Sequence, residues 1–217
     1  MSYDIIAAIK THKVIAICRK IYGEELMLLA EALEKGGIRL IEVTFDHNDP
    51  EAEQKTARAV ALLKSKFPGL SVGAGTVLTP RQVEIVCDNG AQFIVSPNAS
   101  ADVIKRTVEL GLVSIPGAMT PTEILMAHDF GAHFVKLFPA AALGIPYLKS
   151  IRAPINHVDL IATGGIGAEN LAPFLSAGCA GAGIGGSLCD KTLIASGQGA
   201  AITALAKQIT DIAERAN

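Results

Sequence analysis

Lys136 stands in the middle of a short apolar segment, HFVKLFP, where a charged residue needs an explanation. In a strand, Phe134, Lys136 and Phe138 fall on one face, and Val135 and Leu137 on the other. A lysine enclosed among apolar residues has a lowered pKa, so part of it is free amine near neutral pH. A free amine is the nucleophile of Schiff-base chemistry with a carbonyl compound. The alternative is a lysine that extends to the rim of the fold or pairs with an acid there.

Glu42 occupies a similar position in a second apolar segment, RLIEVTF. Alternation places Leu40, Glu42 and Thr44 on one face, which we expect to point in the same direction as Lys136. A carboxylate of opposite charge would pair with that lysine or exchange protons with it. The alternative is a purely structural ion pair, but two inward charges are costly when they have no function.

Two glycine clusters, TGGIGAEN at 163–170 and GIGGSL at 183–188, end two further apolar segments. Glycines let backbone N–H groups face an anion, and a helix N-terminus that follows adds its dipole. A phosphate site formed by these two clusters is therefore predicted. The alternative is that the glycines only form tight turns.

Single polar residues also lie at the ends of apolar segments. Thr76 in GAGTV and Thr163 each offer a hydroxyl for a substrate oxygen, unless they only cap turns. Arg19 offers a planar guanidinium that grips a carboxylate in two places. Its alternative is a surface arginine that begins a loop.

Metal and cysteine chemistry are not predicted. The segment DHND at 46–49 gathers two acids and a histidine, but no second histidine follows any other segment end, so we expect a solvated loop. Cys18, Cys179 and Cys189 have no neighbouring histidine base and are predicted to be buried thiols. A GxSxG turn, the mark of one class of serine hydrolase, is absent from the sequence.

The elements that position these residues follow a repeated sequence pattern: a helical stretch, a glycine, and a short apolar strand. Glycine at a helix end takes the left-handed conformation without strain. The repeat and three further strands at 13–19, 71–77 and 159–165 give eight strands that alternate with helices, which favours a (β/α)8 barrel. An open doubly wound sheet is the alternative, but no GxGxxG follows the first strand. The glycines of the repeated pattern are Gly37, Gly90, Gly111, Gly131 and Gly178.

The composition restricts the class of protein. The 217 residues are 50% hydrophobic and carry 19 basic and 21 acidic side chains, with no basic stripe for nucleic acid. No apolar run reaches the ~20 residues of a membrane span. No linker, low-complexity stretch or charge break divides the chain, so we expect one domain over residues 1–217. The first residues lack a secretory signal, so we expect the protein in the reducing cytoplasm.

Seven motifs follow one another along the chain: IEVTF around Glu42, GAGTV at 73–77, SPN at 96–98, IPGAMTPTE at 115–123, VKLFPA at 135–140, TGGI at 163–166 and GGS at 185–187. In this order they resemble the 2-keto-3-deoxy-6-phosphogluconate / 4-hydroxy-2-oxoglutarate (KDPG/KHG) aldolase family, which includes phosphogalactonate aldolases. The resemblance covers about residues 5–210, and its most specific part is VKLFPA after an IEVTF strand.

The resemblance implies a class I aldolase on a small (β/α)8 barrel, a homotrimer that uses no metal or other cofactor. It places the Schiff-base lysine at Lys136 and the acid–base glutamate at Glu42. The substrate would be a 2-oxo acid that is cleaved to pyruvate and an aldehyde. The implied contacts to substrate are Thr76 and Thr163 for the pyruvyl group, Pro97 and Phe138 in the pocket, and Gly164, Gly165, Gly186 and Ser187 for phosphate.

The sequence departs from the family in one loop. Some members carry an arginine for the substrate carboxylate just after the IEVT strand, but this loop reads Phe45, Asp46, His47. Other members place an arginine at the end of the first strand, where Arg19 stands. The departure leaves the choice open between phosphogluconate, phosphogalactonate and 4-hydroxy-2-oxoglutarate substrates. The competing functions are a phosphosugar isomerase or epimerase on the same barrel, which has no need of Lys136, and a non-catalytic phosphate-binding protein.

Overall fold

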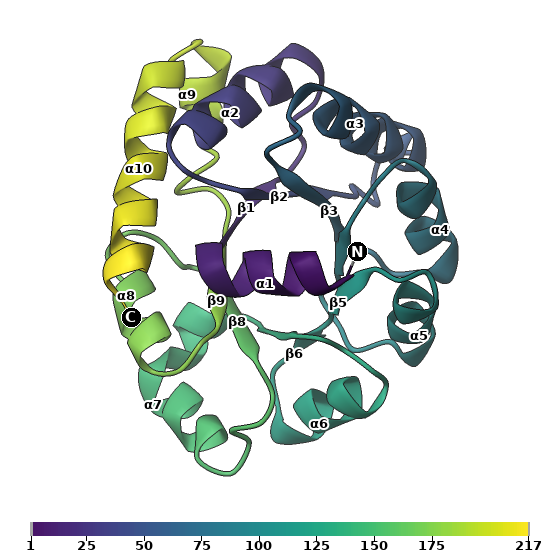
Figure 1. The fold of residues 1–217 in the computed structure, drawn as a ribbon, viewed down its shortest axis with the longest axis vertical. Coiled ribbons are helices and arrows are strands. Elements are labelled where there is room, and N and C mark those ends of the chain that lie inside the picture. The colour runs from purple at the N-terminus through teal and green to yellow at the C-terminus, as the bar shows by residue number, and fades with distance from the viewer. Residues whose placement is uncertain (1, 217) are drawn as a thin grey trace.

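A computed structural model describes residues 2–216 of the chain, and the side chains of residues 5–216. Parallel strands form a barrel in its centre, and helices surround them (Figure 1). The strands are β1 Val14–Cys18, β2 Leu40–Thr44, β3 Ser71–Gly75, β4 Phe93–Val95, β5 Val113–Ile115, β6 Gly117–Ala118, β7 Val135–Leu137, β8 Leu160–Thr163 and β9 Gly181–Ile184.

The barrel closes at a strand that is interrupted by proline. The strand order is β5-β4-β3-β2-β1-β9-β8-β7-β6, so β5 and β6 lie at the two ends of the order although only Pro116 separates them. Pro116 has no N–H to donate to a neighbouring strand. Its carbonyl accepts the Lys136 N–H at 2.8 Å, which joins β7 to the interrupted strand. With β5 and β6 counted as one, the nine segments are the eight strands that the sequence predicts.

Helices follow the strands in alternation, as the sequence predicts. They are α1 Ser2–His12, α2 Gly23–Lys35, α3 Ala52–Lys66, α4 Pro80–Asp88, α5 Ala101–Glu109, α6 Pro121–Asp129, α7 Ala140–Arg152, α8 Leu171–Ser176, α9 Lys191–Ala195 and α10 Gly199–Arg215. None of the helices in this part of the chain combines the length and the apolar character needed to cross a bilayer.

The five predicted helix-ending glycines all have positive φ, between 73° and 101°. At Gly37, for example, the glycine N–H donates to Glu34 O at 3.1 Å and the Ile38 N–H to Leu33 O at 3.0 Å. This pair of bonds is the Schellman motif, which satisfies the last carbonyls of a helix. The role predicted for these glycines is therefore confirmed.

Two apolar clusters hold the barrel together. The larger one fills the layer between the strands and the surrounding helices. The smaller one lies inside the barrel and includes Ile15, Leu40 and Phe134, together with Ile5 and Ile9 of α1. Helix α1 lies across the barrel at the end where the strands begin (Figure 1), so it closes that end. The polar residues that the sequence predicts to be functional lie toward the opposite end of the barrel, where the strands finish.

Candidate active site

Lys136 points into the barrel, as predicted. Its strand neighbours Val135 and Leu137 belong to the cluster on the helix side, whereas Phe134 belongs to the cluster inside the barrel. The residue is only 7% exposed. Burial lowers the pKa of Lys136; the nearby negative charge of Glu42 opposes this shift, and the positive charge of Arg19 adds to it. Free amine is therefore available closer to neutral pH than in an ordinary lysine.

Glu42 faces the same interior from β2 and is 2% exposed. Ile41 and Val43 lie on the helix side, and Leu40 lies inside the barrel, as alternation predicts. Burial raises the pKa of Glu42, while the positive charges of Lys136 and Arg19 oppose the shift. Within the described residues no direct ion pair joins Glu42 to the lysine, so the two groups interact across the barrel without neutralising each other by contact.

Two glycines of β3 leave space inside the barrel, Gly75 for the Glu42 side chain and Gly73 for the ring of Phe93. A Cβ on Gly75 would overlap the Glu42 carboxylate, and a Cβ on Gly73 would overlap the ring of Phe93. Gly73 and Gly75 face inward, because Val72 and Ala74, which alternate with them along β3, pack on the helix side. From this segment, the sequence predicts a functional role only for Thr76. The signal for the space beside Glu42 is the GAG pattern, in which two glycines stand two residues apart.

Arg19 follows the last residue of β1 and is exposed at the barrel mouth. Its positive charge reaches both Glu42 and Lys136, since it shifts the pKa of each. Neither a hydrogen bond nor an ion pair to Arg19 is found within residues 2–216. The guanidinium thus acts electrostatically on Glu42 and Lys136, and its donors have no acceptor among the described residues.

Thr163 and Thr76 lie at the same end of the barrel. Thr163 ends β8 and is buried, and Ile161 before it lies inside the barrel. A Cβ on Gly183 would lie 2.8 Å from the Thr163 hydroxyl, so the neighbouring strand leaves room for it. Thr76 is half-buried just after β3 and has a positive φ of 56°, an uncommon conformation for a β-branched residue.

Phe138 and Pro97 are the two residues that are predicted to line the substrate pocket. The Lys136 Nζ lies 5.0 Å from the centre of the Phe138 ring, a cation–π contact at the mouth of the barrel. Pro97 is half-buried after β4, and its carbonyl approaches Gly117 so closely that a Cβ there would overlap it. Both residues therefore lie at the C-terminal ends of strands.

The two glycine clusters lie next to each other across the last two strands. The Ser187 hydroxyl donates to the Ile166 carbonyl at 3.2 Å, which joins the loop after β9 to the loop after β8. Gly164 and Gly165 both have positive φ. Gly186 is exposed, with no atom within 4 Å of a Cβ built on it. In the described chain, no protein acceptor is found for the N–H groups of Gly165, Gly186 and Ser187.

One part of the phosphate prediction needs correction. The helix that follows the second cluster, α9, does not offer its N-terminus to an anion. The Asp190 carboxylate already accepts hydrogen bonds from the N–H groups of Thr192 and Leu193. Any phosphate at this position must be held by the amides of the glycine loops rather than by this helix.

The DHND segment is a surface loop, as the sequence predicts: His47 and Asn48 are exposed, and Asp46 and Asp49 are half-buried. Asp46 pairs with Lys20 at 2.8 Å, and Asp49 pairs with Lys55 at 2.7 Å. The His47 ring donates its Nε2–H to the carbonyl of Thr76 at 2.8 Å. The loop after β2 therefore contacts the loops after β1 and β3.

The cysteine prediction is confirmed, because Cys18, Cys179 and Cys189 are all buried. Burial raises the pKa of Cys179 to about 12. A hydrogen bond with Cys189, together with burial, raises the pKa of Cys18. Thiols of this kind are poor nucleophiles.

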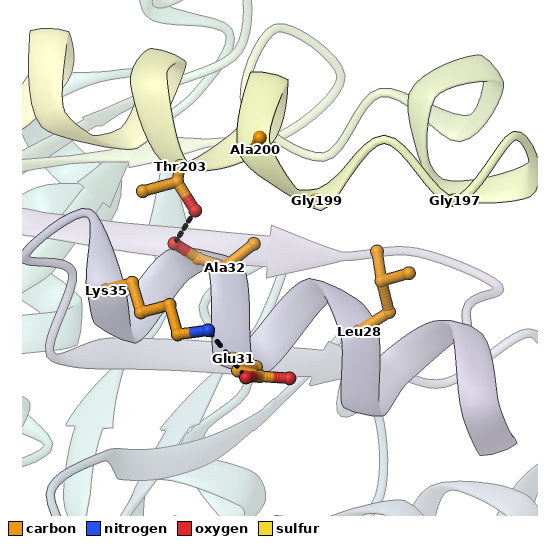
Figure 2. A pocket seen from close by; sticks show the side chains of 8 residues that line it. All are labelled: Leu28, Glu31, Ala32, Lys35, Gly197, Gly199, Ala200 and Thr203. Carbon is orange, nitrogen blue, oxygen red and sulfur yellow. Dashed lines mark hydrogen bonds and ion pairs between the residues drawn. The ribbon is translucent and has the colours of Figure 1, made fainter.

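A hollow of about 520 Å³ lies outside the barrel, between α2 and the start of α10 (Figure 2). The charged residues that line it, Glu31 and Lys35, pair with each other at 2.7 Å. The Thr203 hydroxyl donates to the Ala32 carbonyl at 3.1 Å and joins the two helices. Because the hollow offers no unpaired charge among the described residues, the chemistry belongs at the barrel mouth instead.

Known proteins resemble this chain along nearly its whole length. The family model for KDPG and KHG aldolase matches residues 5–205. A 2-dehydro-3-deoxy-6-phosphogalactonate aldolase of Escherichia coli is 38% identical over 80% of this chain and 83% of its own length. A 2-dehydro-3-deoxy-phosphogluconate aldolase of Haemophilus influenzae is 31% identical over 98% of this chain and 99% of its own.

A solved structure of similar fold also bears on the chemistry. It is a KDPG aldolase of Legionella pneumophila with pyruvate captured at low pH as a covalent carbinolamine intermediate. It shares 33% identity with this chain, covers 93% of it and 96% of its own length, and has a TM-score of 0.83. The family resemblance and the barrel fold expected from the sequence are confirmed. This chain belongs to the KDPG and KHG aldolase family.

Proposed function

We propose that this aldolase cleaves a 2-oxo-3-deoxy-6-phospho sugar acid to pyruvate and glyceraldehyde 3-phosphate through a Schiff base at Lys136. The observation that carries the proposal is a buried lysine with a lowered pKa that faces a buried glutamate at the C-terminal end of a barrel. In such barrels, catalytic residues come from the ends of several strands. An isomerase or epimerase is not favoured, because it needs no lysine in the middle of a strand.

The first half of the reaction forms the imine. The free amine of Lys136 attacks C2 of the 2-oxo acid, and the carbonyl oxygen takes up a proton to give a carbinolamine. Glu42, whose raised pKa lets it hold a proton, donates that proton to the departing hydroxyl, and water leaves. The product is an iminium ion between Lys136 and C2.

The second half breaks the C3–C4 bond. The C4 hydroxyl loses its proton to a base, the C3–C4 electron pair moves toward the iminium nitrogen, and the aldehyde is released. The remaining enamine takes a proton at C3, and water then hydrolyses the iminium to free pyruvate and Lys136. Glu42 is the buried acid–base group that faces this nitrogen, and it returns to its starting state at the end of the cycle.

The remaining site residues hold the substrate. Arg19 and Thr76 would bind the carboxylate, Thr163 would bind the carbonyl end, and Phe138 and Pro97 would line the pocket. The support for this assignment is that all of them lie at the barrel mouth, with an available guanidinium at Arg19. A hydrogen bond from a charged donor contributes about 1.5–3 kcal/mol.

The phosphate would lie against Gly164, Gly165, Gly186 and Ser187. Support comes from the amides without protein acceptors in these two adjacent loops. We expect Gly186→Asp to raise KM for the phosphorylated substrate about tenfold or more, because the carboxylate would repel phosphate. KM for 4-hydroxy-2-oxoglutarate should change little, and Gly186→Ala is the matched uncharged control. Equal effects on both substrates would mean that the cluster is only a turn.

The quaternary state and the location of the protein remain proposals. A homotrimer is supported by the family resemblance, and Met119, Leu125 and Met126 place exposed apolar side chains on and before α6. Light scattering should give three times the chain mass of 22.6 kDa. A cytoplasmic location rests on the sequence alone.

The central experiment traps the imine. Borohydride added with pyruvate should reduce the Schiff base and leave a three-carbon adduct on Lys136, located by peptide mass mapping. Pyruvate release from the phosphogluconate, phosphogalactonate and 4-hydroxy-2-oxoglutarate types of substrate then identifies the preferred aldol. An adduct on another lysine, or no adduct, would overturn the assignment.

A further inference from the structure

The loop after β2, residues 45–51, contacts the neighbouring strand-end loop on each side. Asp46 Oδ2 pairs with Lys20 Nζ at 2.8 Å in the loop after β1. His47 Nε2 lies 2.8 Å from the carbonyl oxygen of Thr76 after β3. Because a carbonyl only accepts hydrogen bonds, the histidine nitrogen must be the donor.

Both contacted residues have an uncommon backbone conformation. Among the described residues other than glycine, positive φ occurs at Lys13, Lys20 and Thr76, with values of 60°, 57° and 56°. Such conformations cost free energy and persist where the surrounding structure fixes them. Two of these three residues are the ones that the loop after β2 holds.

The two held residues also lie where the substrate carboxylate is proposed to bind. Lys20 directly follows Arg19, whose positive charge reaches Glu42 and Lys136. Thr76 itself is the second proposed contact. The conformation of each residue sets the direction in which its loop presents a donor to the barrel mouth.

We propose that Asp46 and His47 are positioning residues that hold the loops of Arg19 and Thr76 in the geometry that binds the substrate carboxylate. The inference rests on the proposed function. It also gives a role to the loop in which some family members carry an arginine. Here Asp46 faces Lys20 rather than the substrate, so the loop contributes the placement of donors instead of a donor.

The same loop offers a matched control. Asp49 is a second aspartate of this loop, paired with Lys55 at 2.7 Å, and its side chain is 22% exposed against 17% for Asp46. Each aspartate also accepts a backbone N–H two residues further on. The Asp49 pair stays between its own loop and α3, so Asp49→Asn removes a similar ion pair without releasing a neighbouring strand-end loop.

The test compares KM and kcat of Asp46→Asn, His47→Ala and His47→Gln with those of Asp49→Asn, well below the melting temperature. We expect His47→Ala to raise KM about five- to tenfold and to change kcat less, as the loss of one hydrogen bond predicts. Asp46→Asn should raise KM up to about fivefold, because its ion pair is partly exposed. His47→Gln keeps an N–H donor and should restore KM to within about threefold of wild type.

A double-mutant cycle separates positioning from general stability. Glycine adopts positive φ without strain, so His47→Ala should raise KM less in a Thr76→Gly background than alone. If the double variant raised KM by the product of the two single-variant effects, the proposed role of His47 would be overturned. Suppose that wild type forms its pyruvate adduct but Asp46→Asn and His47→Ala have the same KM and kcat as Asp49→Asn. The whole inference would then be overturned. The lack of an adduct in wild type would instead overturn the proposed function on which the inference rests.

Discussion

The two ends of the barrel are built from the same strands but differ in what they place inside. Leu40, Phe134 and Ile161 form an apolar layer, which α1 closes from the end where the strands begin. Two residues further along the same strands stand Glu42, Lys136 and Thr163, all buried as well. Since alternation turns every second residue inward, a step of two residues separates a layer that stabilises the fold from the layer that we propose carries the chemistry.

The two ends of the barrel therefore contribute differently to the stability of the fold and to the reactivity of the site. Burial of apolar side chains at the closed end stabilises the barrel by about 1.5–3 kcal/mol for each large side chain. Burial of Lys136 and Glu42 at the open end opposes folding, because each group loses its hydration and no direct ion pair compensates it within the described chain. The strongest tests of this division change one end and measure the property of the other.

The largest effect is expected at Lys136. Lys136→Met removes the nucleophile, so pyruvate release should fall by at least about 10⁴-fold. The double variant Lys136→Met with Glu42→Gln should be more stable than wild type. Its free energy of unfolding should be about 1–4 kcal/mol higher, because both buried charges are gone. Denaturant titration measures this gain, and a loss of stability would show that the open end also supports the fold.

The closed end should behave in the opposite way. Ile9→Ala creates a cavity between α1 and the barrel and should lower the free energy of unfolding by about 2–5 kcal/mol. The value of kcat/KM per folded molecule should stay within about twofold of wild type. Ile6→Ala, at a half-buried position of the same helix, is the control and should cost clearly less. A large kinetic effect of Ile9→Ala would mean that the two ends are coupled.

A smaller effect is expected at Arg19. Arg19→Ala should lower kcat/KM about ten- to hundredfold, because a charge-assisted hydrogen bond to the substrate carboxylate is lost. Slow formation of the Lys136 imine should remain possible. Arg19→Lys should restore only part of the activity, since an ammonium group lacks the planar fork. A change within about twofold would assign Arg19 to the surface.

The smallest effect is a shift in pH dependence. Protonated Lys136 cannot attack, so the rate of imine trapping should rise with pH through the pKa of Lys136. Arg19 lowers this pKa and Glu42 raises it. Arg19→Ala should therefore move the midpoint to higher pH and Glu42→Gln to lower pH, each by less than about one pH unit. Shifts in the same direction would contradict the charge arrangement at the mouth.

The sequence by itself determined the strands, the inward positions and the helix ends. Lys136 and Glu42 could be placed inside the barrel because alternation is a local property of each strand. Gly37 and the four glycines like it could be placed at helix ends because only glycine takes that conformation without strain. The ordered motifs, above all VKLFPA after IEVTF, also indicate the family from the sequence alone.

The tertiary structure alone decided how neighbouring strand ends meet. The space that Gly75 leaves for Glu42, the contacts of Asp46 and His47, and the interruption at Pro116 all depend on barrel closure. So does the position of α1, which closes one end of the barrel. Local periodicity cannot predict these features, because they join residues that become neighbours only when all the strands have taken their places around the barrel.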